Sequence, residues 1–419
     1  MVINKFSRYI PECRLCNSKE FNSFINFDSI AIGNNLQDTK LTALDADEHP
    51  LHVLRCKSCN HFQLNYAVDP NVLYATNYTY LSGIGQSFVI HINNYVDWVA
   101  KETNLSKNSI IVEIGSNDGT CLNVFKEKGY KVCGVDPAKL AADISAKKGI
   151  FTINDFFNDK VVNHIFKKFG HVDIITSQNV LAHVDDLKGT FKKIYNLLKN
   201  NGYFVFEVGY FKNVLEKNYF DTIYHEHLDY HHASPLVNHL CALGFDVANI
   251  STNEIQGGSL RILLQKTGKG IISKGAKAFI KQEMNSILYN KDLLINWSKK
   301  VFDICAEISQ IVKKEKKNGL PCYAYGSPTK ATLLLKMTKL SLNDINFIVE
   351  DNEHKVGKYL PKIGIPIFYV NNLDFKKSAV ILILAWNFSE DIISKLKKLY
   401  KVPIKVIIPL PELKVISLC

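Results

Sequence analysis

Short apolar runs alternate with amphipathic stretches through the middle of the chain, from about residue 76 to residue 268. A short apolar run bounded by glycine or polar residues is typical of a buried strand, whereas apolar positions spaced three or four apart indicate a helix. The alternation predicts a mainly parallel sheet covered by helices on both faces. We expect strands at 109–113, 131–136, 172–177 and 203–208, and helices at 119–128, 138–147 and 186–198.

The pattern changes after the last of these strands. Two apolar runs, 245–250 and 260–266, are separated only by a short polar break containing glycine, which predicts an antiparallel pair at the sheet edge. Residues 273–318 are rich in lysine and isoleucine and lack proline, so they predict one or two long helices that end at 319–321. A second α/β alternation follows, with expected strands at 322–325, 346–349, 379–385 and 402–408.

Composition and charge narrow the class of protein only slightly. Of the 419 residues, 47% are hydrophobic and 22% charged, as in ordinary globular proteins of two or three domains. The net charge of +11 fits nucleic acid, a small anionic ligand such as a nucleotide diphosphate, or a lysine-rich surface. The longest apolar run, 379–386, is too short to span a bilayer, and residues 1–13 contain no signal-peptide core. We expect a cytoplasmic protein without a membrane partner.

Four of the ten cysteines form two CxxC pairs, Cys13/Cys16 and Cys56/Cys59. Each CxxC turn directs two sulfur atoms at one point, so two such turns supply the four thiolates that tetrahedral zinc prefers. Because four thiolates leave no position for water, the predicted site is structural. Four unrelated thiols and a redox pair are the alternatives.

A glycine-containing loop, Glu113-Ile114-Gly115-Ser116-Asn117-Asp118-Gly119, joins the first predicted strand of the central sheet to its helix. Its backbone amides and the helix start face a ligand, and Asp136 at the end of the next strand can accept from two ribose hydroxyls. Dinucleotide enzymes share this layout, but the loop lacks their GxGxxG spacing and begins with an acid. We therefore predict S-adenosylmethionine. The expected cofactor-binding residues are Glu113, Gly115, Ser116, Asn117, Gly119, Asp136, Asp155, Phe156 and Asn179.

The segment 220–232 concentrates four histidines, two tyrosines and three acids after the last parallel strand of this sheet. Such a segment could ligate a metal or be merely structural, but the HEH spacing is not that of a metallohydrolase helix. Acid–base chemistry is the interpretation that we favour. For Asp155 the alternative to adenosine binding is an N-cap.

Together, these motifs resemble the sugar C-methyltransferase family, whose members methylate carbon 3 of dTDP-linked 4-keto-deoxy sugars. The resemblance covers essentially the whole chain and rests on matching segments spread along it. These are the two CxxC pairs, EIGSNDGT at 113–120, NVLAHV with its DL at 179–187, FDTIYHEH at 220–227, GGSLR at 257–261, GSPTKA at 326–331 and VEDN at 349–352.

The resemblance implies an α/β protein in three parts: a zinc-binding module (1–75), a Rossmann-like class I methyltransferase domain (76–268), and a helical linker with a second Rossmann-like α/β domain (269–419). It implies that His227 is the general base. The other expected catalytic residues are Glu226, Tyr224, His183 and Tyr78, with Tyr80 as a substitute for Tyr78. The expected substrate-binding residues are Arg261, Gly326, Lys330 and Asn352.

The expected chemistry is removal of a proton from a carbon beside a ketone, followed by methylation of that carbon. Glu226 is expected to orient His227, and Tyr224, Tyr78 and His183 to stabilise the enolate oxygen. Two departures from the family, Gln256 in place of a histidine and the loop GSPTKAT at 326–332, leave the nucleotide and the sugar open.

Three other functions remain as alternatives. The first is methylation of oxygen or nitrogen on another small molecule. A nucleic-acid methyltransferase should interleave aromatic with clustered basic residues or carry an Asn-Pro-Pro-Tyr loop, and the sequence has neither. An inactive binding protein conflicts with the intact cofactor loop. We expect a monomer that binds a nucleotide-diphosphate keto-sugar, with no nucleic-acid partner.

Overall fold

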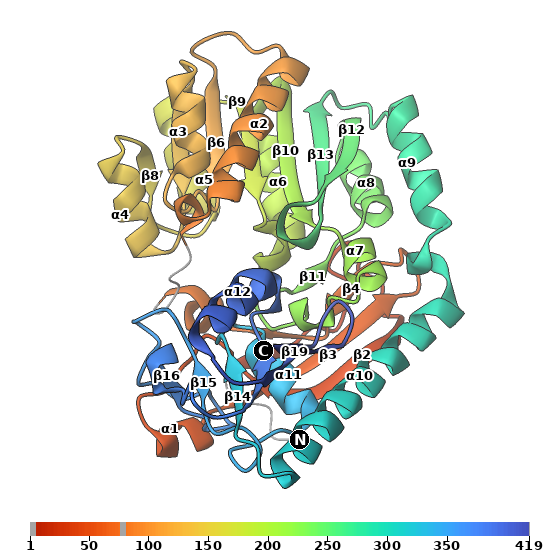
Figure 1. Ribbon diagram of the computed structural model, residues 1–419. Helices are drawn as coiled ribbons and strands as arrows, with labels where there is room; N and C mark the ends of the chain where they lie inside the picture. Colours follow the sequence, from red (N-terminus) through yellow and green to blue (C-terminus); the bar gives the residue numbers. More distant parts are fainter. Residues whose placement is uncertain (1–5, 76–80, 419) are drawn as a thin grey trace.

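The computed structural model of the chain describes residues 6–75 and 81–418 and contains three large sheets, each with its own helices (Figure 1). The central seven-stranded sheet has the order β12-β13-β10-β9-β6-β7-β8. Its strands are parallel except β13, which runs antiparallel to both β10 and β12, so the predicted antiparallel edge pair is confirmed. The bounds are β6 (Ile110–Ile114), β7 (Lys131–Val135), β8 (Phe151–Ile153), β9 (Val172–Gln178), β10 (Leu198–Gly209), β12 (Phe245–Asn253) and β13 (Ser259–Lys266).

Successive residues of these strands face opposite helical layers. Ile111 and Ile174 pack with α2 and α3 on one face, whereas their neighbours Val112 and Ile175 join the core on the other face, which includes α5, α6 and α8. Because both faces of the sheet are buried, alternate residues on both sides of each strand are apolar. Buried parallel strands therefore appear in the sequence as continuous apolar runs. The helices are α2 (Gln86–Thr103), α3 (Thr120–Glu127), α4 (Lys139–Lys147), α5 (Asp159–Phe169), α6 (Leu187–Leu197), α7 (Phe211–Glu216) and α8 (Ala233–Ala242).

The sheet nearest the N-terminus has the order β11-β4-β3-β2. Its outer strand β11 comes from the middle of the chain, where Asp229 pairs with Gln63 and Tyr230 with Phe62. A piece of the predicted methyltransferase segment therefore completes the sheet of the predicted zinc module. The elements of this region are β1 (Ser7–Tyr9), β2 (Phe21–Ala31), α1 (Lys40–Leu44), β3 (Glu48–Cys56), β4 (Phe62–Leu64), β5 (Tyr66–Val68) and β11 (Asp229–Tyr230).

The third sheet has the order β16-β15-β14-β17-β18-β19 and is parallel except for β19. The strands expected after residue 321 are all present. The 27-residue helix α10 precedes this sheet and contacts both β2 and β14, so it links the first and third sheets. The elements are α9 (Lys274–Met284), α10 (Lys291–Lys317), β14 (Cys322–Tyr325), α11 (Ala331–Thr338), β15 (Ile348–Val349), β16 (Ile367–Phe368), β17 (Val380–Ile383), α12 (Ser389–Leu399), β18 (Ile404–Ile408) and β19 (Lys414–Leu418).

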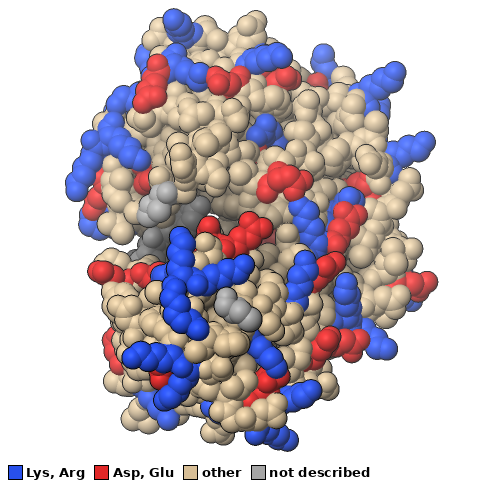
Figure 2. Space-filling view, viewed as in Figure 1, with Lys and Arg blue, Asp and Glu red and all other residues tan. Residues whose placement is uncertain are grey.

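Charged side chains of both signs are interspersed over the face shown in Figure 2, over all the parts of the chain visible there. On this face the lysines and arginines do not gather into one continuous basic strip, as a nucleic-acid groove would require. Among the described residues, no helix is both long and apolar enough to cross a lipid bilayer.

Aromatic rings join the N-terminal sheet to helices from the rest of the chain. Phe24 on β2 stacks on Trp297 of α10 with ring centroids 5.5 Å apart, and it meets Phe62 of β4 edge-on at 5.2 Å. Phe62 is fully buried and lies 4.9 Å from the ring of Phe211 in α7. Such pairs add about 0.5–1.5 kcal/mol each beyond the area that they bury.

Phe62→Ala should therefore lower the free energy of unfolding by about 3–5 kcal/mol, because the cavity lies where three parts of the chain meet. Chemical denaturation followed by far-UV circular dichroism measures this loss. Phe388→Ala is the matched control, since that ring is 64% exposed and should cost less than about 0.5 kcal/mol. Equal effects of the two substitutions would contradict the assigned packing.

Candidate active site

The four predicted zinc ligands converge. Their sulfur atoms all lie within 4.8 Å of one another, with 3.5 Å between Cys13 and Cys59 and 3.5 Å between Cys16 and Cys56. Tetrahedral zinc with Zn–S bonds of about 2.3 Å requires sulfur atoms roughly 3.8 Å apart. The four sulfur atoms are thus close enough together to fit a tetrahedral zinc ion.

The two CxxC turns have the same backbone geometry. Asn17 and Asn60, each directly after the second cysteine of its pair, adopt a left-handed conformation with φ of 63° and 64°. Their amides donate to the carbonyl oxygens of Cys13 and Cys56 at 3.0 Å. Asparagine tolerates this conformation better than most residues, so CxxCN is the local sequence signal of each turn.

The cofactor loop has the geometry that its glycines predicted. Gly115 has φ of 69°, and its amide donates to the carbonyl oxygen of Val135 at 2.8 Å. A Cβ atom at this position would lie 2.2 Å from the side chain of Val180, so only glycine fits. Gly119 also has a positive φ, and the Oγ of Ser145 would meet its Cβ at 2.5 Å.

Asp136 directly follows β7 and orders the same loop. Its Oδ2 accepts from the amide of Asn117 at 2.8 Å, and its Oδ1 accepts from the amide of Ala138 at 2.8 Å. Burial raises the pKa of this carboxyl, although both amide bonds oppose that shift. The carboxylate therefore holds the loop, and its contact with a ribose stays a prediction.

Several buried polar atoms at this edge of the sheet lack a hydrogen-bond partner among the described residues. They include Oε2 of Glu113, Oγ of Ser116 and Nδ2 of Asn179. Burial raises the pKa of Glu113 well above its usual value. A ligand with an amino-acid end and a ribose would satisfy such groups, so these residues fit S-adenosylmethionine.

Asp155 follows β8 and is engaged locally. Its Oδ1 accepts from the amide of Phe156 at 2.8 Å and from Nδ2 of Asn158 at 3.2 Å. The N-cap of α5 is Asn158, whose side chain accepts from the amide of Val161, so the alternative prediction of an N-cap at Asp155 is wrong. The adenine-binding role of Asp155 and Phe156 stays a prediction.

The histidine-rich segment folds as the 3-10 helix η4 (Phe220–Thr222), a turn, and then β11. Nδ1 of His227 donates to the carbonyl oxygen of Thr222 at 2.8 Å, so Nε2 is the unprotonated nitrogen of the neutral ring. The hydroxyl of Tyr224 lies 3.2 Å from this Nε2. The ring of His183, from η3 (Leu181–His183), lies 4.9 Å from that of His227, and its Nδ1 donates to the carbonyl oxygen of Glu226 at 2.7 Å.

Burial sets the charge states of these groups. Desolvation lowers the pKa of His227 to about 4, and it lowers that of His183 to about 3, with the neighbouring His227 adding to the effect. Desolvation also raises the pKa of Glu226 to about 7, against a hydrogen bond from Asn34. At neutral pH both imidazoles are therefore uncharged, which is the state that a base requires.

The carbonyl of Thr222, rather than the carboxylate of Glu226, orients Nδ1 of His227. The reason is the turn between the two residues, which brings the carbonyl oxygen of residue 222 next to this ring nitrogen. Glu226 instead accepts from Nδ2 of Asn34 at 3.0 Å, and Oδ1 of Asn34 accepts from the hydroxyl of Thr329 at 2.6 Å. This chain of bonds crosses from the histidine segment through the N-terminal module to the third sheet. Tyr78 and Tyr80 lie outside the described residues.

Three of the four predicted substrate-binding residues lie at the carboxyl edge of the third sheet. Gly326 follows β14, and Asn352 lies three residues after β15, where its amide donates to Glu350. Lys330 precedes α11, and its Nζ lies 3.1 Å from Asp221 and 3.7 Å from the ring centroid of Trp386. Ligands of parallel α/β sheets bind at this edge.

Arg261, the fourth, lies in the central sheet on β13. Its Nε donates to Glu207 at 2.6 Å, and the rings of Tyr95 and Trp98 lie 5.0 and 4.7 Å from its guanidinium carbon. The structure therefore does not group Arg261 with the other three, since its charge is engaged inside the methyltransferase domain.

Sequence reasoning overlooked several residues of this region, because their neighbours are distant in the chain. Asn34 and Trp386 belong to segments without a recognisable motif, and Thr329 lies within GSPTKA but was not singled out there. Gly33 shows how closely two of these segments approach, since a Cβ there would lie 1.8 Å from the carbonyl oxygen of Thr329. The weak signal was a glycine–asparagine pair in an otherwise irregular stretch.

Comparison with known proteins agrees with this geometry. A zinc-binding domain model matches residues 13–74, a methyltransferase domain model matches 92–250, and a model of the C-methyltransferase C-terminal domain matches 254–411. The C-methyltransferase NovU of Streptomyces niveus is 28% identical over 411 residues, which cover 98% of each chain.

Two solved structures resemble less than half of the chain. Magnesium protoporphyrin IX methyltransferase of Synechocystis PCC 6803 with bound SAM is 12% identical, with a TM-score of 0.33 over 43% of this chain and 79% of that one. An S-adenosylmethionine-dependent methyltransferase of Clostridium acetobutylicum is 15% identical, with a TM-score of 0.34 over 43% of this chain and 92% of that one.

The sheet order, the loop after β6 and the domain matches define an S-adenosylmethionine-dependent methyltransferase of class I with a four-cysteine zinc site. The chain carries a match to the C-terminal domain of C-methyltransferases, and over its full length it is similar to the C-methyltransferase NovU.

Asp136→Asn should weaken binding of S-adenosylhomocysteine by about 10–100-fold, because an amide cannot accept from both loop amides and both ribose hydroxyls. Isothermal titration calorimetry measures this affinity. Asp143→Asn removes an exposed carboxylate from neighbouring helix α4 and should leave affinity unchanged. Unaltered affinity in Asp136→Asn would exclude this residue from the cofactor site.

His225 gives a pH-dependent prediction. Its ring is buried, its Nε2 donates to the carbonyl oxygen of His49 at 3.0 Å, and burial lowers its pKa to about 4. Between pH 6.5 and 4 the unfolded chain binds a proton here that the folded chain does not, so His225 costs stability as pH falls. The unfolding free energy of the wild type minus that of His225→Gln should decrease by up to about 1.4 kcal/mol per pH unit across this window. Denaturation at pH 7.0 and 5.0 tests this, and a constant difference would contradict it.

Proposed function

We propose that the protein methylates a carbon beside the ketone of a nucleotide-linked 4-keto-deoxy sugar, with His227 as the general base. The observation that carries the proposal is the state of His227. Its ring is neutral, the carbonyl of Thr222 fixes its tautomer, and its Nε2 faces the hydroxyl of Tyr224. An unprotonated nitrogen beside a hydroxyl donor is the pair of groups that enolate formation needs.

His227 is positioned beside the cofactor loop by a short series of contacts. The side chain of Val180 fills the space against Gly115, and His183 follows in the same segment. The rings of His183 and His227 are 4.9 Å apart. This continuity supports an acceptor carbon held between the base and the cofactor loop.

In the proposed reaction, Nε2 of His227 takes the proton from the carbon next to the carbonyl. The hydroxyl of Tyr224, which lies against Nε2 before the substrate binds, is then available to donate to the enolate oxygen. A donor of this kind contributes roughly 10²–10³ in rate. S-adenosylmethionine, held by the loop residues and Asp136, supplies an electrophilic methyl group when bound.

We infer a narrower role for His183 than the sequence predicted. Its Nδ1 already donates to the carbonyl of Glu226, and burial lowers the pKa of the ring and keeps it neutral. We infer that His183 holds the turn at Glu226, while donation to the enolate falls to Tyr224. Glu226, with a pKa raised to about 7, is able to take up or release a proton near neutral pH.

The nucleotide is proposed to bind at the carboxyl edge of the third sheet. After β14 the chain adds β15 on one side of that strand and later adds β17 on its other side. Crevices at such a switch point bind nucleotides in many open α/β sheets. Gly326 and Lys330 follow β14, and Asn387, which accepts from Lys330 at 2.7 Å, follows β17. Lys330 also contacts Asp221, one residue before the carbonyl that orients His227, so the two parts of the proposed site adjoin.

The remaining expectations belong to the same proposal. We also propose a monomer, and a reducing compartment such as the cytoplasm, in which the four thiolates stay available to bind zinc. The positive charge at the third sheet is proposed to bind the diphosphate of the substrate. No nucleic-acid partner is expected.

His227→Asn should keep the bond to Thr222, because the asparagine amide replaces Nδ1, but it removes the basic nitrogen. We expect turnover of a dTDP-linked 4-keto-6-deoxy sugar to fall by about 10²–10⁴-fold, with binding of S-adenosylhomocysteine unchanged. Exchange of the carbon-bound proton for deuterium, followed by proton NMR, should be lost together with turnover. His164→Asn, an exposed histidine on α5, is the control.

Retained exchange and turnover in His227→Asn would remove the base from its assigned position. A methyl group found on oxygen or nitrogen in the wild-type product would replace the proposed reaction with the alternative one. Carbon-13 NMR of product made from methyl-labelled S-adenosylmethionine distinguishes these attachments.

A further inference from the structure

We propose that Arg14, inside the first zinc-binding turn, is a positioning residue that locks together the two segments bearing His183 and His227. Its consequence for catalysis rests on the function proposed above. The zinc site would then do more than stabilise its own module, because one of its turns carries the side chain that joins the two histidine segments.

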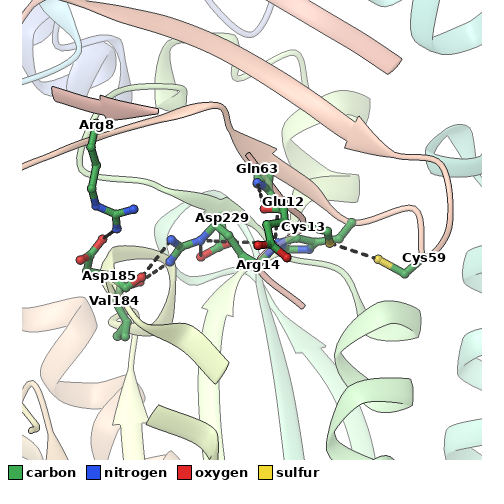
Figure 3. Close-up of polar contacts among 10 residues, drawn as sticks. Arg8, Glu12, Cys13, Arg14, Cys59, Gln63, Val184, Asp185 and Asp229 are labelled. Atoms are coloured by element: carbon green, nitrogen blue, oxygen red, sulfur yellow. Dashed lines mark hydrogen bonds and ion pairs between the residues drawn. The ribbon is translucent and has the colours of Figure 1, made fainter. Parts of the chain in front are cut away.

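The side chain of Arg14 is almost completely enclosed, with 6% of it exposed, and the carboxylate of Asp229 is fully buried. Nε of Arg14 lies 3.0 Å from both carboxylate oxygens of Asp229. One terminal nitrogen donates to the carbonyl oxygen of Asp185 at 3.0 Å, and the other donates to that of Val184. Figure 3 shows the guanidinium between Asp229 on one side and the 184–185 backbone on the other.

These partners are next to the proposed catalytic groups in the chain. Val184 directly follows His183, and Asp229 lies two residues after His227. A planar guanidinium has five donors in a fixed fork, so it can bind a carboxylate and two carbonyl oxygens together. Arg14 thereby sets the separation between the segments that carry the two imidazoles.

The metal site fixes Arg14 at its own end. The residue lies between Cys13 and Cys16, and its amide donates to Oε1 of Gln63 at 2.8 Å, while Nε2 of Gln63 donates to the carbonyl of Glu12 at 3.2 Å. Zinc bound to the flanking cysteines would leave this backbone little freedom. The guanidinium is therefore aimed by a rigid turn rather than by a loop.

The second zinc-binding turn also contacts β11, the strand that contains Asp229. Nε2 of His61, two residues after Cys59, lies 2.8 Å from Oδ1 of Asp229. His232 donates from Nε2 to the carbonyl oxygen of Asn60 at 3.0 Å. Together with the pairing of β11 and β4, these bonds attach the chain at both ends of β11 to the zinc module.

Hydrogen bonds also join the two histidine segments directly, and a change in alignment would disturb them. The amide of Leu228 donates to the carbonyl of Ala182 at 2.7 Å, and His183 donates to the carbonyl of Glu226. Displacements of about 1 Å are enough to reduce turnover strongly when a base must meet a carbon-bound proton. Loss of the guanidinium fork should therefore change the histidine geometry before it affects cofactor binding.

Arg14→Lys is the informative variant, because lysine keeps the positive charge beside Asp229 but loses the planar fork. We expect one zinc per chain by elemental analysis and an affinity for S-adenosylhomocysteine within 2-fold of wild type. With a dTDP-linked 4-keto-6-deoxy sugar, kcat should fall at least 10-fold while KM changes less than 3-fold. Arg8→Lys is the matched control, since Arg8 forms an exposed ion pair with Asp185, also between the zinc module and the 184–185 segment, and should leave every readout unchanged.

A second readout needs no substrate. Nitrogen-15 NMR of the histidine rings, assigned with His183→Asn and His227→Asn, reports the Nδ1–H tautomers that donate to Glu226 and Thr222. These resonances should shift in Arg14→Lys and stay in place in Arg8→Lys. Unshifted resonances in Arg14→Lys would overturn the proposal, as would a loss of zinc or cofactor binding parallel to the loss of kcat. If the wild type fails to methylate the sugar, the proposed function fails, and the NMR result still decides the role of Arg14.

Discussion

The antiparallel pairing of β11 with β4 ties the histidine segment, 220–232, to the N-terminal module. Only two residues of the histidine segment enter that sheet, yet Asp229 among them meets Arg14 and His61 from the two zinc-binding turns. A buried carboxylate needs such partners, since an unpaired charge at this depth would cost several kcal/mol. The cation and the imidazole offset that cost, and they restrict the strand to one position.

Burial has a second consequence at the proposed base. The site lies where the central sheet, the N-terminal module and the loop after β14 meet, and desolvation there keeps His183 and His227 neutral at physiological pH. A lowered pKa makes His227 a weak base in thermodynamic terms. A fixed tautomer and an adjacent hydroxyl are proposed to offset this low basicity, because they position the base and stabilise the enolate.

Much of the fold followed from local pattern. The strands of the central sheet and their order of appearance were readable because buried parallel strands are continuous apolar runs. The loop after β6 was readable because Gly115 and Gly119 must adopt positive φ beside Val180 and Ser145. The zinc site was readable because the four ligands come as two local pairs. In each case the signal is a residue type or a short spacing that can be read locally, although the contacts themselves reach Val180 and join two distant cysteine pairs.

The sequence alone thus determined the central sheet, the cofactor class and the identity of the zinc ligands, since each depends on short-range spacing of residue types. Only the tertiary structure decided which carbonyl orients His227, where Glu226 and Arg261 find their partners, and that Asp229 is shared with the zinc module. Those contacts join segments up to 215 residues apart. Such pairings depend on how three sheets pack, and packing of distant surfaces leaves no periodic signal in the order of amino acids.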